Sequence, residues 1–343
     1  MIYALVFFIF SILIVISINF LSSYFKVLIY EPNLNHKEKF DNIIFNTGGL
    51  IFFLYFVVLN LNYIKLNDLY SFVFLTLIFL IGFFSDIKKS FNANLRLLLI
   101  SLFSIVFIIV SNNQILDLKF NVINNLFINY TFFSIFFTTI CLVILINGIN
   151  FIDGVHGLTL LYGILVLAIL NYFIYFKLGL ENTPETGFLI LPILSILLIY
   201  NFKEKIFFGD SGSYLLGAII GLYVIKLSNL EGYSYPYFYA NLLIYPSFEV
   251  FFSMIRKIFN KKGPYQPDKK HLHHLIQKFY QIKYNYSLTN SKILCALSIN
   301  LFILFFNLVS IYFYYNKYIL ISNIFIFIIF YTFVYLLLSK QVK

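Results

Sequence analysis

Oxygen-bearing side chains recur at helical spacing where one apolar run ends. Asn147, Asn150 and Asp153 occupy positions i, i+3 and i+6 of the segment NGINFIDGVHGL, so on a helix they would share one face. Amide and carboxylate oxygens suit a hard cation or a sugar. Gly154 and Gly157 allow a turn and the close approach of a ligand. The alternative is a polar cap between two apolar runs.

A second polar segment, FGDSGS at residues 208–213, opens a long apolar run. Asp210 and Ser211 are residue types favoured at helix N-termini. A glycine-rich approach such as Gly209 also lets backbone N–H groups hold a phosphate. An aspartate in such a place can hold a divalent cation that bridges phosphate oxygens. A simple helix cap explains the segment about as well.

A third segment combines an acid with several cations. An apolar run ends at Asp86, and Lys88 and Arg96 follow it. Taken alone, this pattern is typical of a helix end whose charged side chains extend into the aqueous phase.

The fourth segment contains most of the histidines. The chain has five, and His271, His273 and His274 are clustered next to lysines. On a helix, His271 and His274 would lie one turn apart. Imidazoles beside lysines suit phosphate recognition. A zinc site is the alternative, although no thiolate or acid pair is near.

The elements that must position these side chains are membrane-spanning helices. Of the 343 residues, 61% are hydrophobic and 11% charged, whereas soluble domains carry about 25% charged residues. The apolar runs are continuous, which favours helices over barrel strands. The composition excludes a water-soluble protein and predicts an all-α, polytopic integral membrane protein with about eleven transmembrane helices. The predicted spans lie near residues 3–24, 43–63, 67–84, 96–112, 128–147, 157–177, 187–201, 211–228, 237–256, 290–314 and 318–339.

Basic residues are unequally divided between the two sets of loops. If the N-terminus lies outside, most of the 24 lysines and arginines fall in the inner loops and the C-terminal tail, as the positive-inside rule requires. The C-terminus and all four polar segments are then cytoplasmic. We expect one membrane-embedded domain over residues 1–343, with a long cytoplasmic loop at 257–292 that carries the histidines. The net charge of +10 then reflects topology more than nucleic-acid binding.

Taken together, the polar segments resemble the motifs of the polyprenyl-phosphate N-acetylhexosamine-1-phosphate transferases, glycosyltransferase family 4. Residues 147–158 are similar to the family motif N-x-x-N-F-x-D-G, residues 208–213 to F-x-G-D-x-G-S, and residues 271–274 to H-x-H-H. The order of the motifs and the number of spans also agree with the family. The H-x-H-H form is more similar to WecA-like and WbpL-like members than to MraY-like ones.

The resemblance implies transfer of an N-acetylhexosamine 1-phosphate from a UDP-sugar to polyprenyl (undecaprenyl) phosphate, with release of UMP. The product would serve cell-surface glycans such as the cell wall or the O-antigen of lipopolysaccharide. The implied partners are a UDP-N-acetylhexosamine, with UDP-GlcNAc as the default, polyprenyl phosphate and the lipid bilayer, without nucleic acid; a homodimer is left open. The implied cofactor is Mg²⁺, with Mn²⁺ as the alternative. The implied location is the inner (plasma) membrane, with the active site on its cytoplasmic face.

The family's functional residues can be carried over onto matching positions of this sequence. Asp86, Asp153 and Asp210 would be the catalytic acids, and Asp210 with Asn150 would hold the metal. The residues that would bind substrate are Asn147, Lys88, Arg96, Gly209, Ser211, Ser213, His271, His273 and His274.

The sequence departs from the family pattern at a few positions. Ser85 precedes Asp86 where two aspartates are expected, and His156 and Glu249 each stand where an aspartate is expected. Glu249 also lies within a predicted span, where an acid is costly and usually functional. With one acid missing, direct attack by the lipid phosphate, aligned or deprotonated by Asp86 or Asp153, is favoured over a covalent aspartyl intermediate. The alternative functions are an inactive relative that binds lipid or nucleotide sugar, and a membrane transporter.

Overall fold

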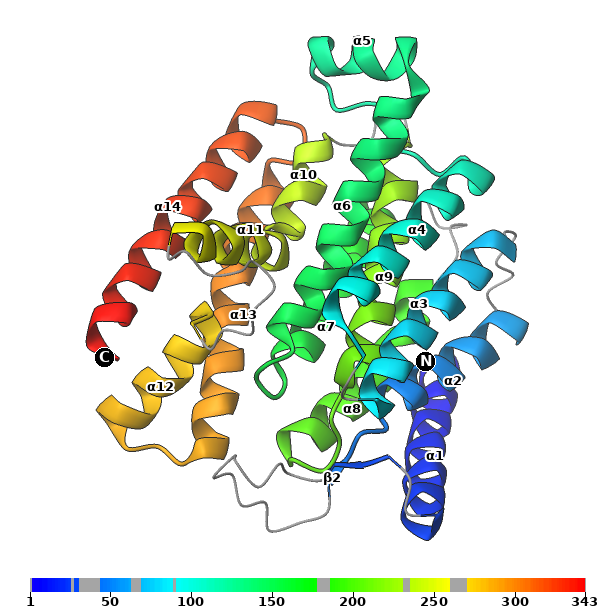
Figure 1. Cartoon of the computed structure of the whole chain (residues 1–343), viewed down its shortest axis with the longest axis vertical. Helices are drawn as coiled ribbons and strands as arrows, with labels where there is room; N and C mark the ends of the chain where they lie inside the picture. Colours follow the sequence, from blue (N-terminus) through cyan, green and yellow to red (C-terminus); the bar gives the residue numbers. More distant parts are fainter. Residues whose placement is uncertain are drawn as a thin grey trace.

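The computed structural model of the chain describes residues 2–25, 28–30, 44–62, 69–88, 91–177, 186–230, 235–259 and 270–342. Most of these residues are helical, which confirms the predicted all-α class (Figure 1). A short antiparallel pair of strands, β1 (Ile29–Tyr30) and β2 (Ile44–Phe45), accompanies the helices. The helices are α1 (Ile2–Phe25), α2 (Gly48–Asn62), α3 (Leu69–Ile87), α4 (Ala93–Ser111), α5 (Asn121–Asn129), α6 (Thr131–Ile152), α7 (Leu158–Tyr172), α8 (Thr186–Phe202), α9 (Gly209–Ser228), α10 (Pro236–Leu242), α11 (Ile244–Phe259), α12 (Leu272–Tyr284), α13 (Leu288–Tyr312) and α14 (Lys317–Gln341), with a π-helical turn at Phe173–Lys177.

Within the described residues, 8 helices are long and apolar enough to cross a membrane, namely α1, α3, α4, α6, α7, α9, α13 and α14. Helices α2 and α8 contain shorter apolar stretches. Together with α10 and α11, which form a bent pair, these helices coincide with the spans predicted from the sequence. The chain is therefore a multi-pass membrane protein, whereas the number of crossings and the sidedness of the termini stay predictions.

The span predicted at residues 237–256 is bent by 70° between α10 and α11. Pro246 lacks the N–H group that would bond to the carbonyl of Leu242 in a continuous helix. That carbonyl accepts a hydrogen bond from the hydroxyl of Tyr162 instead, at an O···O distance of 3.0 Å. A replacement donor is needed because the bilayer core offers no water to a free carbonyl. As a result, α11 runs across the direction of α10 and α14 (Figure 1).

Helix α9 is the central helix of the fold, and most of its side chains are buried. It packs against α2, α3 and α6. The backbones of α3 and α9 touch at Gly82, since a Cβ at this position would lie 2.5 Å from Cα of Ser211. Small residues allow such close helix packing in membranes. This contact brings the last turn of α3 to the first turn of α9.

Backbone hydrogen bonds to β2 hold the segment before α9. The N–H of Phe45 donates to the carbonyl of Lys205 at 3.0 Å, and the N–H of Phe207 donates to the carbonyl of Phe45 at 2.8 Å. The N–H of Gly48, where α2 begins, donates to the carbonyl of Phe207 at 3.0 Å. These bonds fix the path of the chain directly before the first residue of α9.

The region 257–292, predicted as a long loop, contains α12. This helix is amphipathic: Leu272 and Leu275 are buried against the protein, while Lys278 is exposed. Because α12 is too short and too polar to cross a membrane, the sequence predicted a loop in this region. In Figure 1, α12 lies toward the end of the molecule that holds β2, away from α5.

Candidate active site

The aspartate of the FGDSGS segment lies in the first turn of α9. The helix begins at Gly209, whose φ is +75°, in the left-handed region that favours glycine. A Cβ at Gly209 would also lie 2.8 Å from Oδ2 of Asp86. Backbone conformation and space therefore both require glycine here, and Asp210 follows it directly into the helix.

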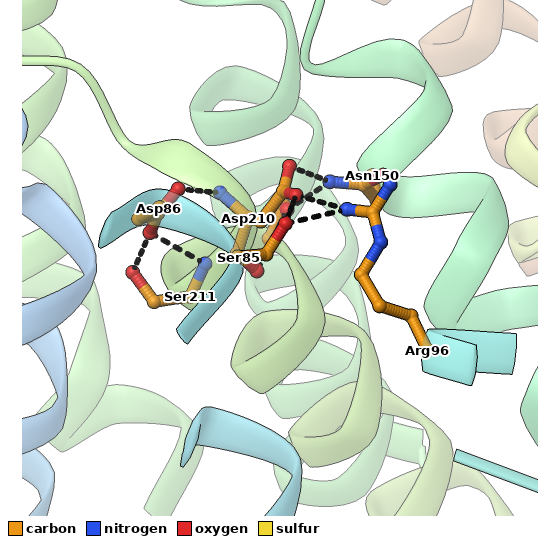
Figure 2. A network of polar contacts seen from close by, with 7 residues as sticks. Ser85, Asp86, Arg96, Asn150, Asp210 and Ser211 are labelled. Atoms are coloured by element: carbon orange, nitrogen blue, oxygen red, sulfur yellow. Dashed lines mark hydrogen bonds and ion pairs between the residues drawn. The ribbon is translucent and has the colours of Figure 1, made fainter. Parts of the chain in front are cut away.

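Asp86, at the end of α3, caps the N-terminus of α9. Its Oδ1 accepts the N–H of Asp210 at 2.9 Å, and its Oδ2 accepts the N–H and the hydroxyl of Ser211 at 3.0 and 2.5 Å (Figure 2). The first N–H groups of a helix have no partner within it, and a carboxylate is a favourable acceptor there. The two oxygens of Asp86 thus hold the first turn of α9, which includes Asp210, in place. Direct participation of Asp86 in catalysis stays a prediction.

The carboxylate of Asp210 gathers side chains from three other helices (Figure 2). Its Oδ2 accepts the hydroxyl of Ser85 at 2.6 Å and forms an ion pair with Nη1 of Arg96. Its Oδ1 accepts Nδ2 of Asn150 at 2.7 Å. Nη1 of Arg96 also donates to Oγ of Ser85 at 2.7 Å. The network exists only where α3, α4, α6 and α9 meet, and it brings together the predicted residues Asp210, Arg96 and Asn150.

The remaining predicted residues of these segments divide into two groups. Ser213 joins the network, because Nδ2 of Asn150 lies 3.0 Å from its Oγ. Asn147 does not, since its Nδ2 donates to the carbonyl of Val143 in its own helix at 2.8 Å. The side chain of Lys88 is exposed and lies outside the network of described residues. The predicted face shared by Asn147 and Asn150 therefore contributes Asn150 alone to this cluster.

The turn between α6 and α7 places Asp153 close to the network. The pKa of Asp153 lies well above its usual range, mainly because the side chain is buried. The negative charges of Asp210 and Asp86 raise the pKa further. A buried carboxyl with a raised pKa suits acid–base work. The structure thus places all three predicted acids around the beginning of α9.

His156, in the same turn, is a neutral histidine at physiological pH. Burial, followed by the positive charge of Lys292, lowers the pKa of His156 to about 3. Its Nδ1 lies 3.6 Å from Oε1 of Glu204. Its ring and that of Phe207 pack edge to face, with 5.0 Å between the ring centroids. Nζ of Lys292 lies 3.4 Å from the same glutamate oxygen. His156 therefore belongs to a neighbouring charged cluster rather than to the Asp210 network.

The histidine segment packs against this turn as well. A Cβ at Gly154 would lie 2.9 Å from Nε2 of His273 and 3.1 Å from Cε1 of His274. His273 is fully buried and neither ring nitrogen has a hydrogen-bond partner. Burial, followed by the charges of His274 and His271, keeps the pKa of His273 well below its usual range. His273 is thus a neutral packing ring in this state, and its predicted binding of substrate stays a prediction.

The oxygen atoms around Asp210 are of the kind that Mg²⁺ prefers. They are the carboxylate of Asp210 and the hydroxyls of Ser85 and Ser213. Asn150 turns its amide nitrogen, Nδ2, toward Asp210 and Ser213, so it would hold a metal only with its amide oxygen in that place. Across the described ranges, no three His, Cys, Asp or Glu side chains gather to hold a metal by themselves. Mg²⁺ is commonly bound by one or two carboxylates, with substrate phosphates and water completing the shell. The carboxylate of Asp210 and the two neighbouring hydroxyls therefore fit a magnesium ion.

Sequence reasoning missed Ser85 and Glu249 as site residues. The sequence marks Ser85 only as the place of a missing acid, yet its hydroxyl joins Asp210 to Arg96. Glu249 contacts His271, with 3.0 Å between Oε2 and Nδ1. An acid within an apolar run was the available signal for Glu249. No comparable signal marks a serine at the end of a helix.

Part of the chain is similar to known proteins. Residues 69–228 match the model of glycosyl transferase family 4. An undecaprenyl-phosphate alpha-N-acetylglucosaminyl 1-phosphate transferase of Thermotoga maritima is 31% identical over 144 residues, 41% of this chain and 43% of that protein. A probable undecaprenyl-phosphate N-acetylglucosaminyl 1-phosphate transferase of Bacillus subtilis is 34% identical over 151 residues, 41% of this chain and 40% of that protein. A phospho-N-acetylmuramoyl-pentapeptide-transferase of Sulfurimonas denitrificans is 28% identical over 215 residues, 54% of this chain and 60% of that protein.

The resemblance inferred from the motifs is therefore confirmed over residues 69–228, which match the glycosyl transferase family 4 model and contain Asp86, Arg96, Asn150 and Asp210. The chain spans between 40% and 60% of the length of these curated relatives. Relatives of both the N-acetylglucosaminyl and the N-acetylmuramoyl-pentapeptide kind match, so the predicted preference for the WecA-like kind stays a prediction.

Proposed function

We propose that the protein transfers an N-acetylhexosamine 1-phosphate from a UDP-sugar to polyprenyl phosphate and releases UMP. The observation that carries this proposal is the meeting of Asp210, Arg96 and Asn150 at the N-terminus of α9. This arrangement suits an anionic diphosphate and its counter-ion. Relatives named as sugar 1-phosphate transferases support the same class of reaction. UDP-GlcNAc and undecaprenyl phosphate, on the cytoplasmic face of the plasma membrane, are the substrates and place we expect first.

The reaction needs little covalent chemistry from the protein. An oxygen of the lipid phosphate attacks the β-phosphorus of the UDP-sugar, and the bond between this phosphorus and the bridging oxygen breaks. UMP leaves with that oxygen, and the lipid gains the sugar 1-phosphate. Phosphoryl transfer of this kind depends mainly on positioning and on neutralisation of charge. The guanidinium of Arg96 is the cation in contact with Asp210 and is placed to neutralise phosphate oxygens.

The acids take different parts in this account. Asp86 positions Asp210, because its two oxygens are engaged by the first turn of α9. Asp153, whose pKa is raised by burial, is the better group of the two to align the lipid phosphate or exchange a proton with it. Asp210 and Asn150 would hold Mg²⁺, or Mn²⁺ in its place, and the ion would neutralise the diphosphate and the departing UMP.

A second candidate function is a binding protein without turnover. The serine at position 85 favours it, because the family pattern has an acid there. A covalent aspartyl intermediate is the alternative chemical route, and trapping of a phosphorylated enzyme with the UDP-sugar alone would favour it over direct attack.

The test is release of UMP by the purified protein in detergent. The mixture contains undecaprenyl phosphate, Mg²⁺ and one UDP-N-acetylhexosamine at a time, with Asp210→Asn, lipid-free and chelator-treated samples as controls. We expect lipid-dependent UMP from the wild type that is lost in the variant. Binding of a UDP-sugar without UMP release, by protein shown to be folded, would favour the binding protein.

A further inference from the structure

Glu249 is a carboxylate that the transferase reaction, as described above, does not use. It lies in α11 and is only 1% exposed, within an otherwise apolar part of the chain. A buried carboxylate is costly unless it is hydrogen-bonded or paired. Its partners therefore indicate why this position carries an acid.

Both oxygens of Glu249 bind the beginning of α12. Oε1 accepts the N–H of Leu272 at 3.2 Å, and Oε2 lies 3.0 Å from Nδ1 of His271. His271 is the N-cap residue of α12, and its own side chain makes no capping hydrogen bond. Glu249 thus caps α12 from a different helix, and the bend between α10 and α11 sets the direction that brings it there.

The contact with Nδ1 fixes more than the helix end. An ionised carboxylate only accepts hydrogen bonds, so Nδ1 of His271 carries the hydrogen that it donates to Glu249, and Nε2 is the remaining nitrogen. Two aromatic rings also pack against the ring of His271. Phe151 lies edge to face with it, with 5.7 Å between the ring centroids, and His273 is stacked parallel to it, with 5.5 Å between the ring centroids. Among the described residues, Nε2 of His271 has no hydrogen-bond partner. Phe151 lies next to Asn150, so the pinned ring adjoins the segment that contributes to the Asp210 network.

We propose that Glu249 is a positioning residue, which holds His271 with its proton on Nδ1 so that Nε2 is presented to the phosphate groups of the sugar donor. Carboxylates orient metal-binding histidines in the same way, and loss of such an orienting partner typically costs about 10- to 100-fold in affinity or activity. This inference rests on the proposed transferase function for the identity of the ligand. The orientation of the ring does not depend on that function.

The first arm of the test measures the histidine itself. The full chain is labelled with ¹⁵N-histidine and reconstituted in nanodiscs, and the signals of His271 are assigned from their loss in His271→Asn. We expect the wild type to show Nδ1 of His271 protonated, and Glu249→Gln to show a mixture of tautomers. Ser253→Ala, one turn further along α11 and equally buried at 1%, is the matched control and should leave the signals unchanged. A wild-type ring protonated on Nε2 alone would overturn the proposal, and this reading does not depend on how the variants fold.

The second arm measures kinetics. We expect Glu249→Gln to raise KM for the UDP-sugar by about tenfold, with KM for polyprenyl phosphate unchanged. A merely structural loss would lower the active fraction and leave both KM values as they are, and that result would overturn the proposal. If the wild type has no transferase activity, the proposed function fails, while the tautomer measurement still decides the role of Glu249.

Discussion

Asp86 on α3 accepts both the backbone N–H and the hydroxyl of Ser211 on α9, at 3.0 and 2.5 Å. The carboxylate of Asp86 therefore caps the N-terminus of α9, although it belongs to another helix. Replacing it by asparagine removes one acceptor oxygen and places N–H groups opposite N–H groups. We expect Asp86→Asn to lower the free energy of unfolding by about 1–2 kcal/mol, in addition to any loss of activity. Denaturant unfolding in mixed micelles measures the change. Asp117→Asn, which affects the exposed pair with Lys119, should cost less than about 1 kcal/mol, and an equal cost for the two variants would contradict the capping role.

The hydroxyl of Ser85 contacts both Asp210 and Arg96. An aspartate at position 85 would therefore place a second carboxylate next to that of Asp210. We expect Ser85→Asp to tighten binding of Mg²⁺ or Mn²⁺ by about tenfold, equivalent to roughly 1.4 kcal/mol, because the added carboxylate increases the negative charge at the site. Titration calorimetry on the purified protein measures this without substrate. Ser85→Ala removes the hydroxyl without adding charge and should give no gain. If Ser85→Asp binds the cation no more tightly than Ser85→Ala, the ion is not held at Asp210.

The raised pKa of Asp153 makes a prediction about stability and pH. The unfolded value is about 3.9 and the folded value lies above it, so the folded protein holds this proton more tightly. The stability that it contributes is full below about pH 4 and is lost as pH rises through the folded pKa. Asparagine does not titrate. The Tm of Asp153→Asn relative to the wild type should therefore increase as pH rises, measured in the presence of a chelator.

Asp117 provides a control of opposite sign for that measurement. Partial burial acts to raise the pKa of Asp117, but hydrogen bonds from Lys119 and Asn124 outweigh burial and hold this pKa below its usual range. Its contribution is therefore present at neutral pH and lost as pH falls. The Tm of Asp117→Asn relative to the wild type should decrease as pH rises. The same trend for both variants would contradict the assignment for Asp153.

Gly154 allows the histidine segment to approach the turn after α6. A methyl group there would lie 2.9 Å from Nε2 of His273, and the ring is packed too tightly to move freely. We expect Gly154→Ala to lower kcat/KM by about 10- to 100-fold, since small misplacements of binding groups have effects of this order. Gly163→Ala is the control, because its methyl group would meet the flexible end of Leu216 away from the site. Equal activity of both variants would show that the histidines need not rest on this turn.

Local patterns predicted a large part of this molecule. Each continuous apolar run became a helix, and the residue types at Asp210 and Asn150 marked each of them as a candidate to hold a cation. Their actual contact joins residues 60 positions apart in the chain, and only the resemblance of the motifs indicated it. The spacing also predicted that Asn147 would join Asn150, but a bond to its own helix satisfies this amide.

The features that the sequence did not reveal depend on tertiary contacts. The bend at Pro246 is stable because Tyr162, far away in sequence, donates to the freed carbonyl. The pairing of Glu249 with His271 requires that bend. Ser85 became part of the site because α3 and α9 meet at Gly82. None of these contacts has a periodic or compositional signal within a single segment.

The proposed function requires that a sugar 1-phosphate, and not the sugar alone, is transferred at Asp210. The most direct measurement uses UDP-GlcNAc labelled with ³²P at the β-phosphorus, together with undecaprenyl phosphate and the protein in nanodiscs. We predict that the label moves into the lipid phase with the wild type and stays in the aqueous phase with folded Asp210→Asn. Label that remains in UDP while the sugar reaches the lipid, or transfer that persists in the variant, would contradict the account.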